Sequence, residues 1–73
     1  MVNLTKKNNT WSVSGEGKAF DNFSSIETAA HFLMHYFKVK DEAIDDALIE
    51  MLLLGRSRAI FNADGELEST VEA

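Results

Sequence analysis

Two turn signals near the N-terminus constrain the fold more than any other feature of the chain. Asparagine tolerates positive φ, so Asn8-Asn9 suits a two-residue hairpin turn, and that register places Leu4 opposite Val13. A second turn, centred on Glu16-Gly17, reverses the chain again after a segment of alternating apolar and polar residues. We therefore expect a β meander within residues 2–22.

The next segment has the pattern of an amphipathic helix over residues 25–37. Ser24 and Glu27 have the spacing of a capping box, in which the hydroxyl and the carboxylate each bind a free backbone amide. Apolar side chains then recur at helical spacing over a wide face. Such a face indicates burial against both the sheet and a second helix.

A second helix is expected over residues 41–54, after a connection of three residues. Asp41 is a favourable N-cap, and Gly55 suits the left-handed position that ends a helix. The side chains expected to face the core are Ile44, Ala47, Leu48, Met51 and Leu52.

The C-terminal residues 58–71 have the pattern of a β hairpin. Asn62-Ala63-Asp64-Gly65 predicts a type I turn with glycine at the left-handed position. The order of strands, two helices and strands predicts one α+β domain over residues 1–73. In this fold a small antiparallel sheet, built from the meander and the C-terminal hairpin, packs on a two-helix hairpin. No cysteine is present to supply a disulfide, so stability depends on the apolar core.

Charge is distributed unevenly along the chain. The net charge is -5, and residues 1–40 carry +2 whereas residues 41–73 carry -7. An acidic half disfavours nucleic acid and anionic lipid and favours basic surfaces. The longest apolar run, Met51 to Leu54, is too short to span a membrane, and the N-terminus has no apolar signal core. We therefore expect a cytoplasmic protein.

The second predicted helix carries five acidic residues and no basic residue between positions 41 and 50. Asp41, Glu42 and Asp45 lie in its first turn, where they compensate the positive end of the helix dipole. Asp46 and Glu50 lie beyond that turn and align with Glu42, and like charges four residues apart repel one another. Dipole compensation does not explain this acidic row of Glu42, Asp46 and Glu50.

Apolar side chains adjoin the acidic row at Ile49 and Leu53. An acidic row beside an apolar edge suits contact with a basic, partly hydrophobic protein. A solvated helix face, with both apolar residues wedged under the hairpin, is the competing interpretation. A homodimer that hides these two residues is also compatible with the pattern. The predicted partner contacts are Glu42, Asp45, Asp46, Ile49, Glu50 and Leu53.

No catalytic, cofactor or metal motif is present. Gly15-Glu16-Gly17-Lys18 lacks the spacing of a phosphate-binding loop and indicates a hairpin turn. His31 and His35 lie four residues apart on a helix, but no cysteine or Glu-x-x-His pattern supplies further ligands. We therefore expect imidazoles that face solvent or a partner, no bound metal or cofactor, no small-molecule substrate and no enzymatic activity.

Direct binding of nucleic acid is disfavoured, although two closely spaced helices suggest a helix-turn-helix. The first turn of the second helix is acidic, and the phosphate backbone would repel it. Arg56 and Arg58, which follow this helix, are expected to cap its last carbonyls and to pair with Glu66 or Glu68. The alternative basic contact for nucleic acid comprises Lys6, Lys7, Lys18, Arg56 and Arg58.

The chain resembles small bacteriophage-encoded regulators of host RNA polymerase in length, in its acidic composition without cysteine, and in element order. The order is hairpin (Trp11 to Phe20), helix (Ile26 to Phe37), helix (Asp41 to Leu54) and hairpin (Ala59 to Val71), so the resemblance covers the whole chain. It implies binding to bacterial RNA polymerase in the host cytoplasm, inhibition of initiation through displacement of sigma factor or interference with promoter opening, and antitermination. A small nucleic-acid-binding protein or a homodimeric adaptor is the alternative.

Overall fold

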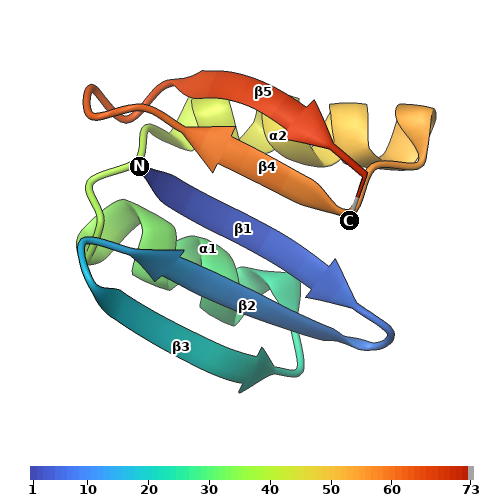
Figure 1. Ribbon diagram of the computed structural model, residues 1–73, viewed down its shortest axis with the longest axis horizontal. Helices are drawn as coiled ribbons and strands as arrows, with labels where there is room; N and C mark the ends of the chain where they lie inside the picture. Colours follow the sequence, from blue (N-terminus) through green and yellow to red (C-terminus); the bar gives the residue numbers. More distant parts are fainter. Residues whose placement is uncertain (73) are drawn as a thin grey trace.

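The computed structural model describes residues 1–72 and shows two helices on one face of a five-stranded antiparallel sheet (Figure 1). This is the predicted α+β arrangement. The elements in chain order are β1 Val2–Lys7, β2 Thr10–Gly15, β3 Lys18–Phe23, α1 Ile26–His35, α2 Asp41–Leu54, β4 Arg58–Phe61 and β5 Leu67–Val71.

The N-terminal meander has the predicted turns and register. Leu4 lies opposite Val13, and the turn residue Asn8 has a φ of 56°. Glu16 and Gly17, which have φ values of 52° and 76°, form the second turn. Strand β3 continues one residue beyond the predicted limit, because Phe23 pairs with Trp11 across a bulge in the β2–β3 ladder.

Strand β1 is the centre of the sheet, whose order is β3-β2-β1-β4-β5. The C-terminal hairpin joins through β4, which pairs antiparallel with β1 and places Ala59 opposite Leu4. Helix α1 packs on β2 and β3, whereas α2 packs on β4 and β5. The core between the two layers comprises Val2, Leu4, Val13, Ala29, Leu33, Val39, Ala43, Ile44, Ala47, Met51, Ala59 and Phe61.

Helix α1 is shorter than predicted and has a different N-cap. The cap is Ser25, whose hydroxyl accepts a hydrogen bond from the amide of Thr28, so the predicted cap at Ser24 is wrong. The helix ends at His35 rather than at residue 37. Lys38 has a φ of 61°, so the backbone leaves the helical conformation before α2 begins.

Helix α2 has the predicted limits, and Gly55 ends it in the left-handed conformation. The N-cap, however, is Lys40, and Asp41 is the first helical residue, so the predicted cap at Asp41 is wrong. Leu52 was also expected in the core, but it is 83% exposed. The sheet lies against the side of α2 that carries Ala43, Ala47 and Met51, which turns Leu52 outward.

The connection between the helices is fixed to the turn between β4 and β5. The amide of Lys40 donates to the carbonyl of Gly65 over 2.8 Å. Gly65 has a φ of 78°, and a Cβ at this position would lie 2.4 Å from the carbonyl oxygen of Lys38. Glycine is therefore required both by the predicted turn and by this close approach of two backbones.

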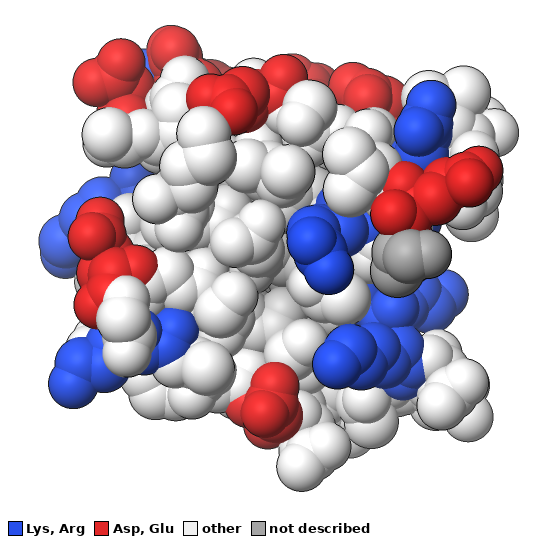
Figure 2. Space-filling model, viewed as in Figure 1, with Lys and Arg blue, Asp and Glu red and all other residues white. Residues whose placement is uncertain are grey.

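Neither helix of residues 1–72 covers the other face of the sheet (Figure 1). Figure 2 shows this face, with acidic side chains gathered along the edge formed by β5 and α2 and basic ones near the β1–β2 turn. A shallow hollow of about 340 Å³ on it is lined by Asn3, Thr5, Lys7, Ser12, Ser14, Ala19, Asp21 and Arg58.

Candidate protein-binding surface

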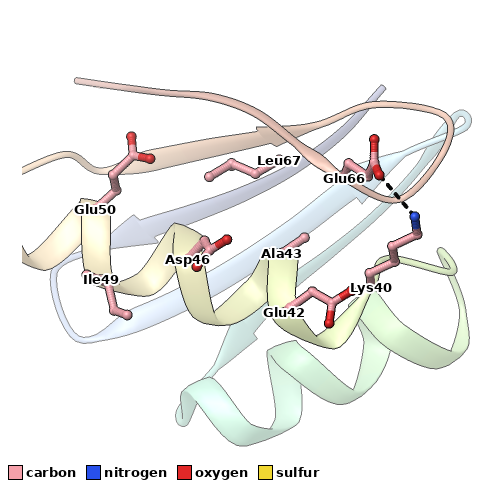
Figure 3. Close-up of a pocket in the computed structure, with 8 residues that line it drawn as sticks. All are labelled: Lys40, Glu42, Ala43, Asp46, Ile49, Glu50, Glu66 and Leu67. Carbon is pink, nitrogen blue, oxygen red and sulfur yellow. Dashed lines mark hydrogen bonds and ion pairs between the residues drawn. The ribbon is translucent and has the colours of Figure 1, made fainter.

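The acidic row lies along a groove between α2 and the start of β5 (Figure 3). We call this the acidic groove, and its volume is about 550 Å³. Four of its lining residues are carboxylates, which come from α2 and from the β4–β5 turn. The lining residues are Lys40, Glu42, Ala43, Asp46, Ile49, Glu50, Glu66 and Leu67.

Glu50 differs from the other two members of the row. Its carboxylate points toward β5 (Figure 3). It accepts a hydrogen bond of 2.8 Å from the hydroxyl of Thr70. This bond is partly buried and joins the outer edge of the sheet to α2. Glu50 therefore has a structural role, which sequence spacing alone does not reveal because Thr70 lies twenty residues away.

Glu42 and Asp46 are exposed, and within residues 1–72 neither carboxylate makes a hydrogen bond or an ion pair. The nearby cation, Lys40, pairs instead with Glu66 at 3.0 Å. The hydrogen bond and the charge of Glu66 raise the pKa of Lys40 above 10.5, and the charge of Glu42 adds to this shift. Lys40 is thus held at one end of the groove, and Asp46 has no counterion within the described chain.

The other three predicted contacts lie at different positions relative to the acidic groove. Ile49 lines it and is 56% exposed, with its side chain pointing away from β5 (Figure 3). Leu53 is 76% exposed and lies one helical turn further along. Asp45 is exposed but does not line the groove. The structure therefore brings together four of the six predicted contacts: Glu42, Asp46, Ile49 and Glu50.

A second groove, which was not predicted from the sequence, borders the C-terminal half of α2. We call it the apolar groove, and its volume is about 530 Å³. It is lined by residues of β1, β2, α1 and α2 together with the residues that follow α2. These are Lys6, Trp11, Ile26, Leu48, Met51, Leu52, Gly55 and Arg56. The run Leu52 to Leu54 could have indicated an apolar surface here, since a helix with one buried face cannot bury three consecutive leucines.

The predicted basic contact does not form one patch. Lys6 lies over the ring of Trp11, 5.7 Å from its centroid, in the apolar groove together with Arg56. Lys7 and Arg58 instead line the hollow on the open face of the sheet. Lys18 begins β3, and its side chain lines neither this hollow nor the apolar groove.

The expected ion pairs of the two arginines are absent from the described part of the chain. Glu66 pairs with Lys40, and Glu68 makes no ion pair with either arginine. Arg56 does bind the end of α2, but through its backbone amide, which donates to the carbonyl of Met51 over 3.0 Å. Its side-chain Nε is inaccessible to water and has no hydrogen-bond partner among residues 1–72.

The two histidines are exposed on α1 with their ring centroids 4.3 Å apart. They border a shallow depression together with Phe32 and Tyr36. Within residues 1–72, no group of three or more histidine, cysteine, aspartate or glutamate side chains is arranged to hold a metal ion.

Comparison of the chain with protein-family models, with curated proteins and with solved structures found no match. In the described part of the chain, neither helix has the length and apolar character needed to cross a membrane.

Proposed function

We propose that this chain is a non-enzymatic protein-binding module and that it contacts its partner through the acidic groove. The observation that supports this proposal is the pair of exposed carboxylates of Glu42 and Asp46, which form no ion pair among residues 1–72 and lie beside the apolar side chain of Ile49. Unpaired surface charge beside an apolar edge suits a partner with basic and hydrophobic side chains.

The partner proposed is bacterial RNA polymerase, on the basis of the resemblance in length, composition and element order. In this proposal the chain acts in the host cytoplasm, where it displaces sigma factor or promotes antitermination. The division of the basic side chains between two faces favours a protein partner over nucleic acid, because Lys6 and Arg56 line the apolar groove whereas Lys7 and Arg58 line the hollow on the open face of the sheet.

The test is a pull-down of purified bacterial RNA polymerase by the tagged chain and by the double variant Glu42→Lys/Asp46→Lys. Glu50 stays unchanged, because its bond to Thr70 would confound the result. The matched control is Asp21→Lys/Glu27→Lys, which makes the same change in net charge with exposed residues of β3 and α1. We expect the first variant to bind at least about tenfold more weakly and the control to bind like the wild type.

Equal binding by both double variants would show that the acidic groove is not the contact. Absence of polymerase binding by the wild type would exclude this partner. A gel shift with DNA or RNA at low salt tests the nucleic-acid alternative, for which we expect no shift at micromolar protein.

A further inference from the structure

Three residues at spacings of four and three form a stripe along the outer side of α2. They are Asp45, Ile49 and Leu52, and Arg56 follows beyond Gly55, whose left-handed conformation ends the helix. This alternation is that of one seam of a coiled coil, in which the side chains face a second helix. All three are exposed, so within the described chain no element covers this stripe, which we call the seam.

The seam begins with an acidic residue, continues with two apolar ones, and is followed by basic side chains beyond the end of the helix. Asp45 lies in the acidic first half of α2, whereas Arg56 follows the helix and lines the apolar groove together with Lys6. An antiparallel arrangement of two such seams brings each acidic end against a basic end. The surface is therefore complementary to a second copy of itself, which is the requirement for a two-fold symmetric dimer.

Arg56 gives an independent indication of a missing partner. Its Nε is inaccessible to water and has no hydrogen-bond acceptor among residues 1–72, although a guanidinium in such a position is normally paired. Glu66, the expected carboxylate, pairs with Lys40 instead. A carboxylate that enters the apolar groove from outside would meet the rest of the guanidinium, since Nε itself is out of reach from outside.

We propose that two copies of this chain associate through an antiparallel pairing of their α2 helices. With the two-fold axis at the level of Glu50 and Met51, Ile49 of each copy lies opposite Leu52 of the other. In the same arrangement Asp45 of each copy lies near the end of the other copy's α2, where Arg56 follows Gly55. The acidic groove lies on the side of α2 that faces β5, so the pairing leaves Glu42 and Asp46 accessible but covers Ile49, which the acidic groove and the seam share.

The test is sedimentation equilibrium of the wild type and of charge-swapped variants. Arg56→Glu and Asp45→Arg each place like charges opposite one another, and each contact occurs twice in the dimer, so either variant should raise the dimer Kd at least about tenfold. The double variant Asp45→Arg/Arg56→Glu exchanges the two charges within one chain. We expect it to return the Kd to within about threefold of the wild type.

Two matched controls use residues away from the seam. Arg58→Glu makes the same charge change as Arg56→Glu but on the open face of the sheet, and it should leave the Kd unchanged. Leu52→Ser should raise the Kd at least about tenfold, whereas Leu54→Ser, at an exposed leucine off the seam, should change it little. Because Leu52 and Asp45 are exposed, their variants test the pairing even if Arg56→Glu does not fold.

A wild type that stays monomeric up to about 1 mM would overturn the proposal. So would a dimer that is unaffected by Leu52→Ser, or a double variant whose Kd is no lower than those of the single variants. A monomer that binds acidic peptides through Arg56 would also overturn it, because the apolar groove would then bind a different protein rather than a second copy.

Discussion

The two grooves along α2 differ in almost every respect although one helix forms a wall of both. The acidic groove contains four carboxylates and one lysine, whereas the apolar groove contains Trp11 and leucine side chains with two cations at its edge. The difference shows that the uneven distribution of charge along the sequence becomes an uneven distribution of charge over the surface only after folding. The sheet covers one side of α2, and the two remaining edges of the helix carry different chemistry.

The two grooves also differ in how they are held. Three contacts fix the wall of the acidic groove: the Lys40–Glu66 ion pair, the Thr70–Glu50 hydrogen bond and the close approach at Gly65. The apolar groove is bounded mainly by side-chain packing, and one of its lining residues, Leu52, is almost fully exposed. We therefore expect substitutions in the walls of the two grooves to change the free energy of unfolding by different amounts.

The largest expected difference is between two neighbouring residues of α2. Met51→Ala should lower the free energy of unfolding by about 2–5 kcal/mol, because Met51 is buried in the core. Leu52→Ala should lower that of the monomer by less than about 0.5 kcal/mol, because its side chain is exposed. Urea unfolding of both variants, at concentrations too low for association, measures the difference. Similar losses would mean that Leu52 is buried and the apolar groove closed.

The next largest effect concerns the backbone behind the acidic groove. Gly65→Ala should destabilise the fold by about 2 kcal/mol or more, because the new Cβ would meet the carbonyl of Lys38 as well as adopt a positive φ. Gly17→Ala is the matched control, since its φ is also positive but its Cβ would meet nothing within 4 Å. It should cost only about 1 kcal/mol. Equal losses in thermal unfolding would show that the close approach is not required.

The smallest expected effect concerns the ion pair at the end of the acidic groove. Glu66 raises the pKa of Lys40 above 10.5, so the pair's contribution to stability is fully present below that pH and is lost as pH rises through the raised pKa. Glu66→Gln should remove most of this pH dependence, whereas Glu42→Gln should change it less. An NMR titration measures the pKa of Lys40 in each variant. A larger change in this pKa in Glu42→Gln than in Glu66→Gln would contradict the pairing of Lys40 with Glu66. The change in stability near neutral pH should be small, because both side chains are exposed to solvent.

Most of the secondary structure could be predicted because its signals are local. The two turns of the meander, the limits of α2 and the turn at Gly65 each depend on φ preferences or on helical spacing within a few residues. The error at Ser24 arose because two adjacent serines are nearly equivalent as caps, and the position of the helix selects Ser25. The candidate site was predicted in part, since Glu42, Asp46, Ile49 and Glu50 do line one groove.

The sequence by itself determined the α+β element order, the meander register and the concentration of acid on α2. Only the tertiary structure decided that Leu52 is exposed, that Glu50 binds Thr70 and that Arg56 lies beside Lys6 and Trp11. The physical reason is that spacing fixes which side chains share a helix face but not the angle at which the sheet meets that face. That angle depends on packing among residues far apart in the chain, and it selects which apolar and acidic residues remain accessible to a partner.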